Sequence, residues 1–152
     1  MKDIFSDWFA TIYERLFSIF NADYQEPVFQ YLFDSGFYIM LGVIFISVPL
    51  ALMALFYYVW HYPYSRWWHW LIWFAMTILI VFGFTFGYAN TFILGSNAPE
   101  MVPCFNVQAC SDYINGLPLE YAKANIILGM IVGFIGSLIL KQWSKVQTHI
   151  PF

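Results

Sequence analysis

Residues 67–94 of the chain read WWHWLIWFAMTILIVFGFTFGYANTFIL, a stretch that holds no Asp, Glu, Lys or Arg. A helix of about 20 residues, rising about 1.5 Å per residue, is long enough to cross the hydrocarbon core of a bilayer. Residues 37–60 and 121–143 form two further apolar stretches of sufficient length. The sequence therefore predicts three transmembrane helices.

The composition indicates the same class of protein. Of the 152 residues, 61% are hydrophobic and 10% are charged, whereas soluble domains are about 45–50% apolar and about 25% charged. The small net charge of −3 argues against nucleic acid as a partner. We therefore expect an all-α integral membrane protein, a single membrane domain over residues 1–152 whose surroundings are the lipid bilayer.

The acidic residues all lie at one end of the predicted spans, together with Lys2, Arg15 and Lys123. The carboxylates all precede the first span or lie between the second and the third: Asp3, Asp7, Glu14, Asp23, Glu26, Asp34, Glu100, Asp112 and Glu120. The short connection 61–66 and the C-terminal end carry Arg66, Lys141 and Lys145. Basic residues near span ends favour the cytoplasmic side. We expect a bacterial inner-membrane protein with its N-terminus and the loop 95–120 outside and its C-terminus in the cytoplasm.

The predicted outer loop 95–120 contains both cysteines, Cys104 and Cys110. Disulfides persist in oxidising compartments, so a bridge between them agrees with an outer position of the loop. The alternative is a pair of free thiols. Two cysteines with no histidine nearby do not supply the four ligands that structural zinc requires, and we expect no metal site.

Residues 4–20 predict an amphipathic helix. At about 100° per residue, one broad face collects the apolar side chains of Ile4, Phe5, Trp8, Phe9, Ile12, Leu16, Ile19 and Phe20. Asp3, Asp7 and Glu14 form an acidic stripe on the other side. Helices that bind membrane surfaces usually carry Lys and Arg there, so the stripe favours a protein partner or a water-filled vestibule. The alternative is a solvated face on a helix at the membrane surface.

Two spans contain glycines four residues apart. Gly83 and Gly87 lie in the second span, and Gly129 and Gly133, followed by Gly136, lie in the third. Glycines at this spacing allow two helix backbones to approach closely, which favours helix association in lipid. Either both glycine faces serve packing within the chain, or at least one faces another subunit.

Polar residues at membrane depth are few. No ionisable residue is central in a predicted span, and ion-coupled transporters normally place one there. Asn90 and Asn125 lie near the outer boundary and are candidates for a structural hydrogen bond between the second and third spans.

Catalytic and cofactor-binding patterns are also missing from the sequence. A cysteine pair in the loop of a small helical membrane protein resembles bacterial disulfide-regenerating enzymes, but those carry a Cys-x-x-Cys pair besides the loop pair, and this chain has only Cys104 and Cys110. His61 and His69 flank an aromatic-rich turn, a poor position for haem ligands. We expect a non-enzymatic protein without a cofactor.

Two classes of function are compatible with these patterns. The first is an assembly or structural subunit of a membrane complex, which packs through its glycine faces against itself or other membrane subunits and presents an acidic extracytoplasmic surface. The second is a homo-oligomeric pore or channel, of an effector or holin-like type, whose acidic vestibule would favour cations. Three spans with an outer N-terminus resemble one holin arrangement.

Overall fold

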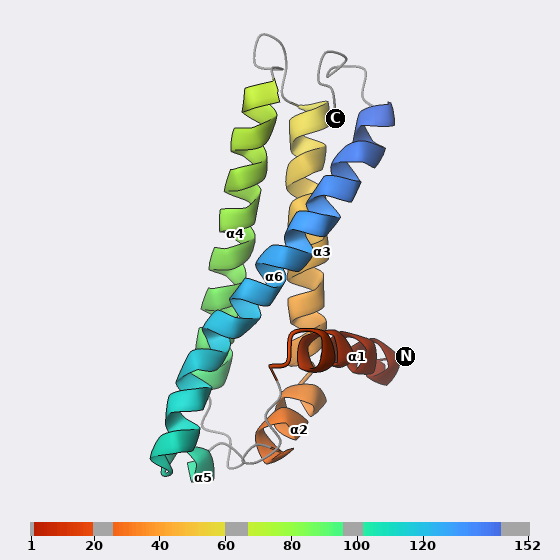
Figure 1. Cartoon of the computed structure of the whole chain (residues 1–152). Helices are drawn as coiled ribbons and strands as arrows, with labels where there is room; N and C mark the ends of the chain where they lie inside the picture. The colour runs from red at the N-terminus through yellow and green to blue at the C-terminus, as the bar shows by residue number, and fades with distance from the viewer. Residues whose placement is uncertain (1, 20–25, 60–66, 96–101, 144–152) are drawn as a thin grey trace.

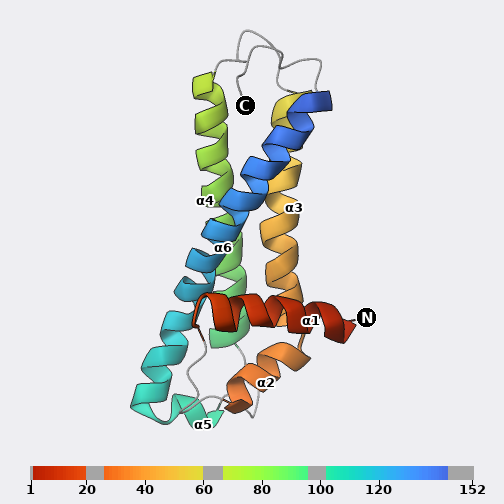
Figure 2. The same cartoon turned by 45° about the vertical axis from the view of Figure 1, so that its right-hand side comes forward.

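The computed structural model describes residues 2–19, 26–59, 67–95 and 102–143, and every regular element in these ranges is a helix. Three long helices form a bundle, α3 (Phe37–Tyr58), α4 (Trp67–Leu94) and α6 (Gln108–Trp143), seen side by side in Figures 1 and 2. Each is long and apolar enough to cross a membrane. The predicted fold class is confirmed. The predicted turn 61–66 and the tail after residue 143 lie outside the described residues.

The helix α6 begins at Gln108 rather than at residue 121, where we expected the third span to start. Gly116 and Pro118 gave this region the character of a loop, because both residues disfavour a helix interior. In the structure Ile114, Leu117 and Tyr121 are all buried, and their spacing places them on one helical face. The burial of this face outweighs the local signals. The expected loop 95–120 is therefore helical over 102–105, which forms the short α5 (Val102–Phe105), and over 108–120.

The glycines of α6 pack against the other two long helices. A Cβ atom added at Gly133 would lie 3.1 Å from Cε2 of Phe74 on α4 and 3.4 Å from Cβ of Pro49 on α3. A Cβ atom added at Gly129 would lie 3.3 Å from Cγ1 of Val81, and one added at Gly136 would lie 2.6 Å from Cδ2 of Leu50; both glycines are buried. Small residues here let α6 approach both partners closely, so the glycine face of α6 is covered within the chain.

The amphipathic segment lies across the bundle near the start of α3 (Figures 1 and 2). It consists of α1 (Lys2–Thr11) and one continuing π-helical turn, η1 (Ile12–Leu16), so the predicted helix 4–20 stops at Leu16. Ser18 has a φ of 51°, a left-handed conformation that turns the chain away from the helix. Phe20 lies outside the described residues.

A further helix, α2 (Glu26–Asp34), lies beyond α1 at the same end of the molecule, which we call the α1 end. Gly36 joins α2 to α3 with a φ of 78°, a conformation that a residue without a side chain adopts at little cost. The larger of the two apolar clusters in the described residues lies at this end and includes Leu32, Phe37 and Leu41.

The aromatic residues at the opposite end divide between surface and interior. Trp67 and Trp68 are exposed, as is usual for aromatic rings that lie at the level of the lipid headgroups. Tyr57 and Trp70 are buried instead, and both hydrogen-bond the hydroxyl of Ser137 on α6, at 2.7 and 2.9 Å. Because a buried Tyr or Trp needs a partner for its polar atom, Ser137 ties the three long helices together at this end.

Candidate functional site

A buried polar cluster joins the amphipathic segment to all three long helices. The amide nitrogen of Asn125 on α6 donates to Oγ1 of Thr85 on α4 at 2.9 Å and to the carbonyl oxygen of Leu41 on α3 at 3.3 Å. Its amide oxygen accepts a hydrogen bond from the hydroxyl of Tyr13 on η1. The predicted bond between Asn125 and Asn90 is wrong, because Asn90 is exposed on another side of α4.

Three tyrosine rings surround this amide. The hydroxyl of Tyr38 donates to Oε1 of Glu14 at 2.9 Å and lies 3.3 Å from the hydroxyl of Tyr121. The ring of Tyr13 lies 5.9 Å from that of Tyr38 and 5.6 Å from that of Tyr121, measured between centroids. Sequence reasoning missed all three tyrosines. The available signal was that a tyrosine inside an apolar segment needs a partner for its hydroxyl.

The acidic stripe does not behave as one solvated surface. Burial raises the pKa of the Glu14 carboxyl, although the hydrogen bond from Tyr38 and the charge of Arg15 act in the opposite direction. Asp7 is exposed, and it lines with Glu14 and Arg15 a pocket of about 250 Å³ between α1–η1 and α2. The side chain of Asp3 lies outside what the structure describes. Glu14 is thus the one stripe residue seen to join the polar cluster in the described part of the chain.

The two cysteines connect α5 to the first turn of α6. The Cα atoms of Cys104 and Cys110 are 5.2 Å apart and their sulfur atoms lie at bonding distance. Both side chains are buried. The bridge predicted from the sequence agrees with this geometry, and it fixes the start of α6 to the short helix before it.

The glycines of α4 have surroundings opposite to those of α6. Gly83 and Gly87 are exposed, and a Cβ atom added at either position would meet no atom within 4 Å. Leu79, Phe86 and Asn90 are exposed as well, at three- and four-residue spacings that place them on the same side of the helix. We call this surface the α4 glycine face.

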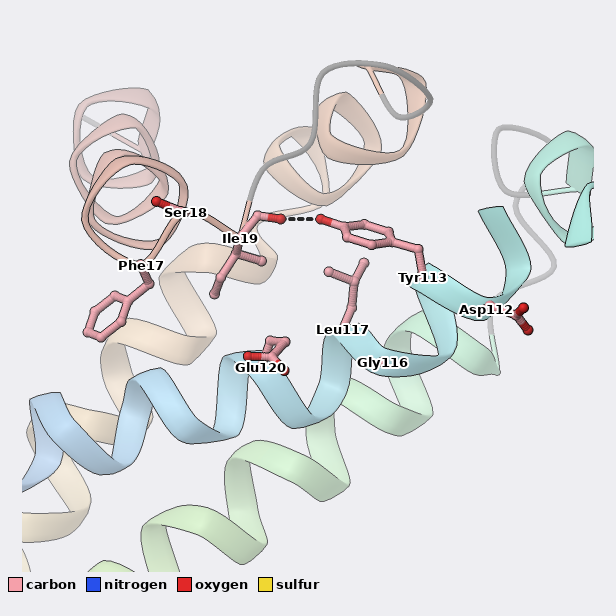
Figure 3. Close-up of a pocket in the computed structure, with 8 residues that line it drawn as sticks. All are labelled: Phe17, Ser18, Ile19, Asp112, Tyr113, Gly116, Leu117 and Glu120. Atoms are coloured by element: carbon pink, nitrogen blue, oxygen red, sulfur yellow. Dashed lines mark hydrogen bonds between the residues drawn. The ribbon is translucent and has the colours of Figure 1, made fainter. Parts of the chain in front are cut away.

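A pocket of about 410 Å³ opens at the α1 end between the turn after η1 and the first turns of α6 (Figure 3). The hydroxyl of Tyr113 crosses it to donate to the carbonyl oxygen of Ile19. Glu120, on its rim, forms an ion pair with Lys123 at 2.7 Å, and both side chains are about half exposed. Exposed pairs of this kind contribute little to stability. Asp112 points away from the Tyr113–Ile19 bond in this view.

The described residues contain no group of three or more His, Cys, Asp or Glu side chains suited to hold a metal ion. The polar cluster is buried and internally hydrogen-bonded, so its geometry serves to fix α1–η1 on the bundle. The α4 glycine face is a mainly apolar helix surface on which the described part of the chain leaves Gly83 and Gly87 uncovered. In comparisons with known proteins, the chain matched no family model, no curated protein and no solved structure.

Proposed function

We propose that the protein is a non-enzymatic assembly subunit of a membrane complex and that α4 is the helix through which it packs on another transmembrane helix. The observation that carries this proposal is the outward position of Gly83 and Gly87, where an added Cβ would meet none of the described residues within 4 Å. In lipid, apolar burial does not drive helices together, and close backbone contact takes its place.

The contrast between α4 and α6 supports this proposal. The two helices carry glycine pairs of the same spacing, yet Gly133 lies against Phe74 and Pro49, whereas a Cβ added at Gly83 or Gly87 would meet none of the described residues within 4 Å. Large apolar side chains facing lipid are ordinary in a membrane protein and indicate no partner. A flat strip of two glycines between exposed Leu79 and Phe86 is the shape that a second helix fills.

Asn90 adds a polar group to the α4 glycine face. Its side chain is exposed, and no hydrogen bond joins it to another side chain or backbone group among the described residues. Asparagine side chains near membrane depth hydrogen-bond across helix interfaces and contribute about 1 kcal/mol there. A partner helix on this face would satisfy the amide as well as fill the groove.

The proposal includes the orientation in which the α1 end is outside and residue 152 is in the cytoplasm. It is supported by the basic residues Arg66, Lys141 and Lys145 at the other end, since Lys and Arg near span ends favour the cytoplasm. The exposed carboxylates of Asp7 and Asp112 would then face extracytoplasmic partners. Reporter tags at the two chain ends, read by protease protection, check this orientation: the two ends are expected on opposite sides of the membrane, because three crossings put them apart.

The orientation test therefore has a simple reading. Protection of a C-terminal tag and digestion of an N-terminal tag in intact cells are the expected results. Digestion of the C-terminal tag alone would show that the orientation is the reverse of the one proposed. The same response at both ends would mean that fewer than three helices cross the bilayer.

The assembly test compares Gly83→Leu/Gly87→Leu with Gly116→Leu. All three glycines leave an added Cβ free of contacts within 4 Å, so neither variant is expected to disturb the fold of a single chain. We expect the wild-type protein and Gly116→Leu, extracted from native membranes in mild detergent, to migrate as a particle larger than one chain. We expect the double variant to migrate as one chain with unchanged helix content.

Two outcomes contradict the proposal. One is a wild-type particle that contains a single chain, and the other is a large particle that survives the double substitution. Conductance of the purified wild-type protein in planar bilayers distinguishes the assembly subunit from a pore. We expect no current. A cation-selective current that falls when Asp7 and Glu14 are neutralised would contradict the proposal and show that the protein is a channel.

A further inference from the structure

An apolar groove of about 420 Å³ lies in the angle between α1 and α3. Its walls come from both helices: Phe5 and Phe9 on α1, and Ile39, Gly42, Val43, Ile46 and Ser47 on α3. The hydroxyl of Ser47 is the one polar side-chain group in this lining. None of these lining residues is charged, so the groove they form has the chemistry of a site for hydrocarbon.

The position of α1 over this groove is fixed by a close contact. The ring of Phe9 lies on Gly42, where an added Cβ would be 2.5 Å from Cζ. The same ring meets Phe45 edge-on with 5.8 Å between centroids. Together with the hydrogen bond from Tyr13 to Asn125, this contact holds α1–η1 at one level of the bundle.

That level lies within the apolar part of the molecule. The α3 residues of the groove belong to a helix with a mean hydropathy of 2.6 in its most apolar window, and Val43 is exposed there. The side of α1–η1 that faces away from the bundle is also apolar: Ile4, Trp8 and Leu16 are 72%, 59% and 70% exposed. Water around all of these side chains would be costly, because exposed apolar patches of this size are rare on soluble surfaces.

We propose that α1–η1 lies in the membrane interface and that the groove beneath it holds an acyl chain of a lipid in that leaflet. Interfacial helices bury their apolar face about 5–10 Å into the boundary between headgroups and acyl chains. The apolar surface of α1 is continuous, through the groove, with the lipid-facing side of α3. Thr11 and Arg15 line the pocket between this segment and α2, are exposed and would face the headgroups and water.

A second transmembrane helix does not suit this groove. Figures 1 and 2 show α1 running across the bundle near the start of α3, and Phe5 and Phe9 of α1 form one wall of the groove. A spanning helix is about 10–12 Å wide with its side chains and would have to pass through α1 to reach the headgroups. An acyl chain is thinner and ends inside the bilayer, so it enters from the open side and fits below α1.

The depth of α1 is tested with nitroxide labels at Phe5→Cys and, as the matched control on the same helix, Thr11→Cys. The protein is placed in phosphatidylcholine vesicles without reductant, so that Cys104 and Cys110 stay paired. We expect the label at residue 5 to be several-fold more accessible to oxygen than to a water-soluble nickel chelate, and the label at residue 11 to show the reverse. Equal nickel access at both positions would overturn the interfacial position and leave the apolar side of α1 to a protein partner.

The acyl-chain site is tested with phosphatidylcholine carrying a nitroxide on its chain. We expect Val43→Trp, which fills the groove, to reduce the motionally restricted lipid signal. Ile131→Trp is the control, because Ile131 is an exposed residue of α6 outside the groove, and we expect it to leave the signal unchanged. If restricted lipid is the same in wild type and Val43→Trp at equal helix content, the groove holds no lipid chain.

Discussion

A single buried amide organises the α1 end of the molecule. Asn125 receives partners from η1, α3 and α4, and none of its hydrogen-bonding groups is left to lipid. A buried amide without such partners costs several kcal/mol in an apolar solvent. The arrangement of four separate elements around this residue is therefore specified by polar geometry as well as by apolar packing.

Removal of one hydroxyl tests the importance of this amide. We expect Tyr13→Phe to lower the free energy of unfolding by about 1–2 kcal/mol, because the amide oxygen of Asn125 loses its donor while the ring is retained. Tyr58→Phe serves as the control, since Tyr58 is exposed and its change is expected to be near zero. The measurement is unfolding in mixed detergent micelles followed by circular dichroism; equal loss in the two variants would contradict the assigned role.

Glu14 gives the protein a pH dependence whose sign follows from its surroundings. Burial raises the pKa of this carboxyl in the folded state, so the folded protein binds the proton more tightly than the unfolded chain does. The contribution of Glu14 to the free energy of unfolding is therefore fully present below the pKa that its carboxyl has in the unfolded chain. It is lost as pH rises through the higher pKa of the folded state. Since the Glu14 side chain is partly exposed, the effect is expected to be modest.

The predicted consequence is that the stability of the wild-type protein changes with pH at a different slope from that of Glu14→Gln. We expect the wild-type protein to lose stability relative to Glu14→Gln as pH rises from about 4 to about 7, the range above the ordinary carboxyl pKa. Glutamine keeps an acceptor for the hydroxyl of Tyr38 without ionising. Thermal unfolding of both proteins across this range is the measurement, and parallel curves would show that Glu14 does not titrate differently in the two states.

At the scale of elements, α1 is held on α3 by the fit of one ring over one glycine. Phe9 is buried over Gly42, and its neighbours Phe5 and Trp8 remain exposed. The helix therefore has three kinds of side: one against the bundle, one apolar and open, and one polar. The sequence pattern described this helix only in part. It showed one broad apolar face, and the structure divides that face into a side that packs on the bundle and a side that is open.

The contact predicts a local response to Gly42→Leu. The added side chain collides with Phe9, and we expect the whole chain to lose about 1–3 kcal/mol of stability through overpacking, with faster amide hydrogen exchange over residues 4–16. Gly116→Leu is the matched control, because it replaces a helical glycine that has open space around it and should be neutral or slightly stabilising. Unchanged protection of α1 in Gly42→Leu would mean that Phe9 does not hold the helix.

At the scale of the whole molecule, long apolar runs predicted the spans because hydropathy and length decide which helices cross a bilayer. The polar cluster could not be predicted in this way, since Tyr13 and Asn125 are 112 residues apart in the chain. Neither residue lies in a local sequence pattern that identifies the other as its partner. The glycine pairs illustrate the same limit. Their spacing is identical in α4 and α6, and only the packing of three helices determines that one pair is covered and the other exposed.

The length of α6 has a mechanical consequence. Its 36 residues extend about 54 Å at about 1.5 Å per residue, against a hydrocarbon thickness of about 30 Å. One continuous rod thus carries both the disulfide-clamped cap and the segment that crosses the bilayer. A force on the first turns of α6, which the disulfide joins to α5, would be transmitted as a tilt to the far end of the helix at Trp143. Pro118, where the helix lacks a backbone hydrogen bond, is the point at which the helix can bend instead.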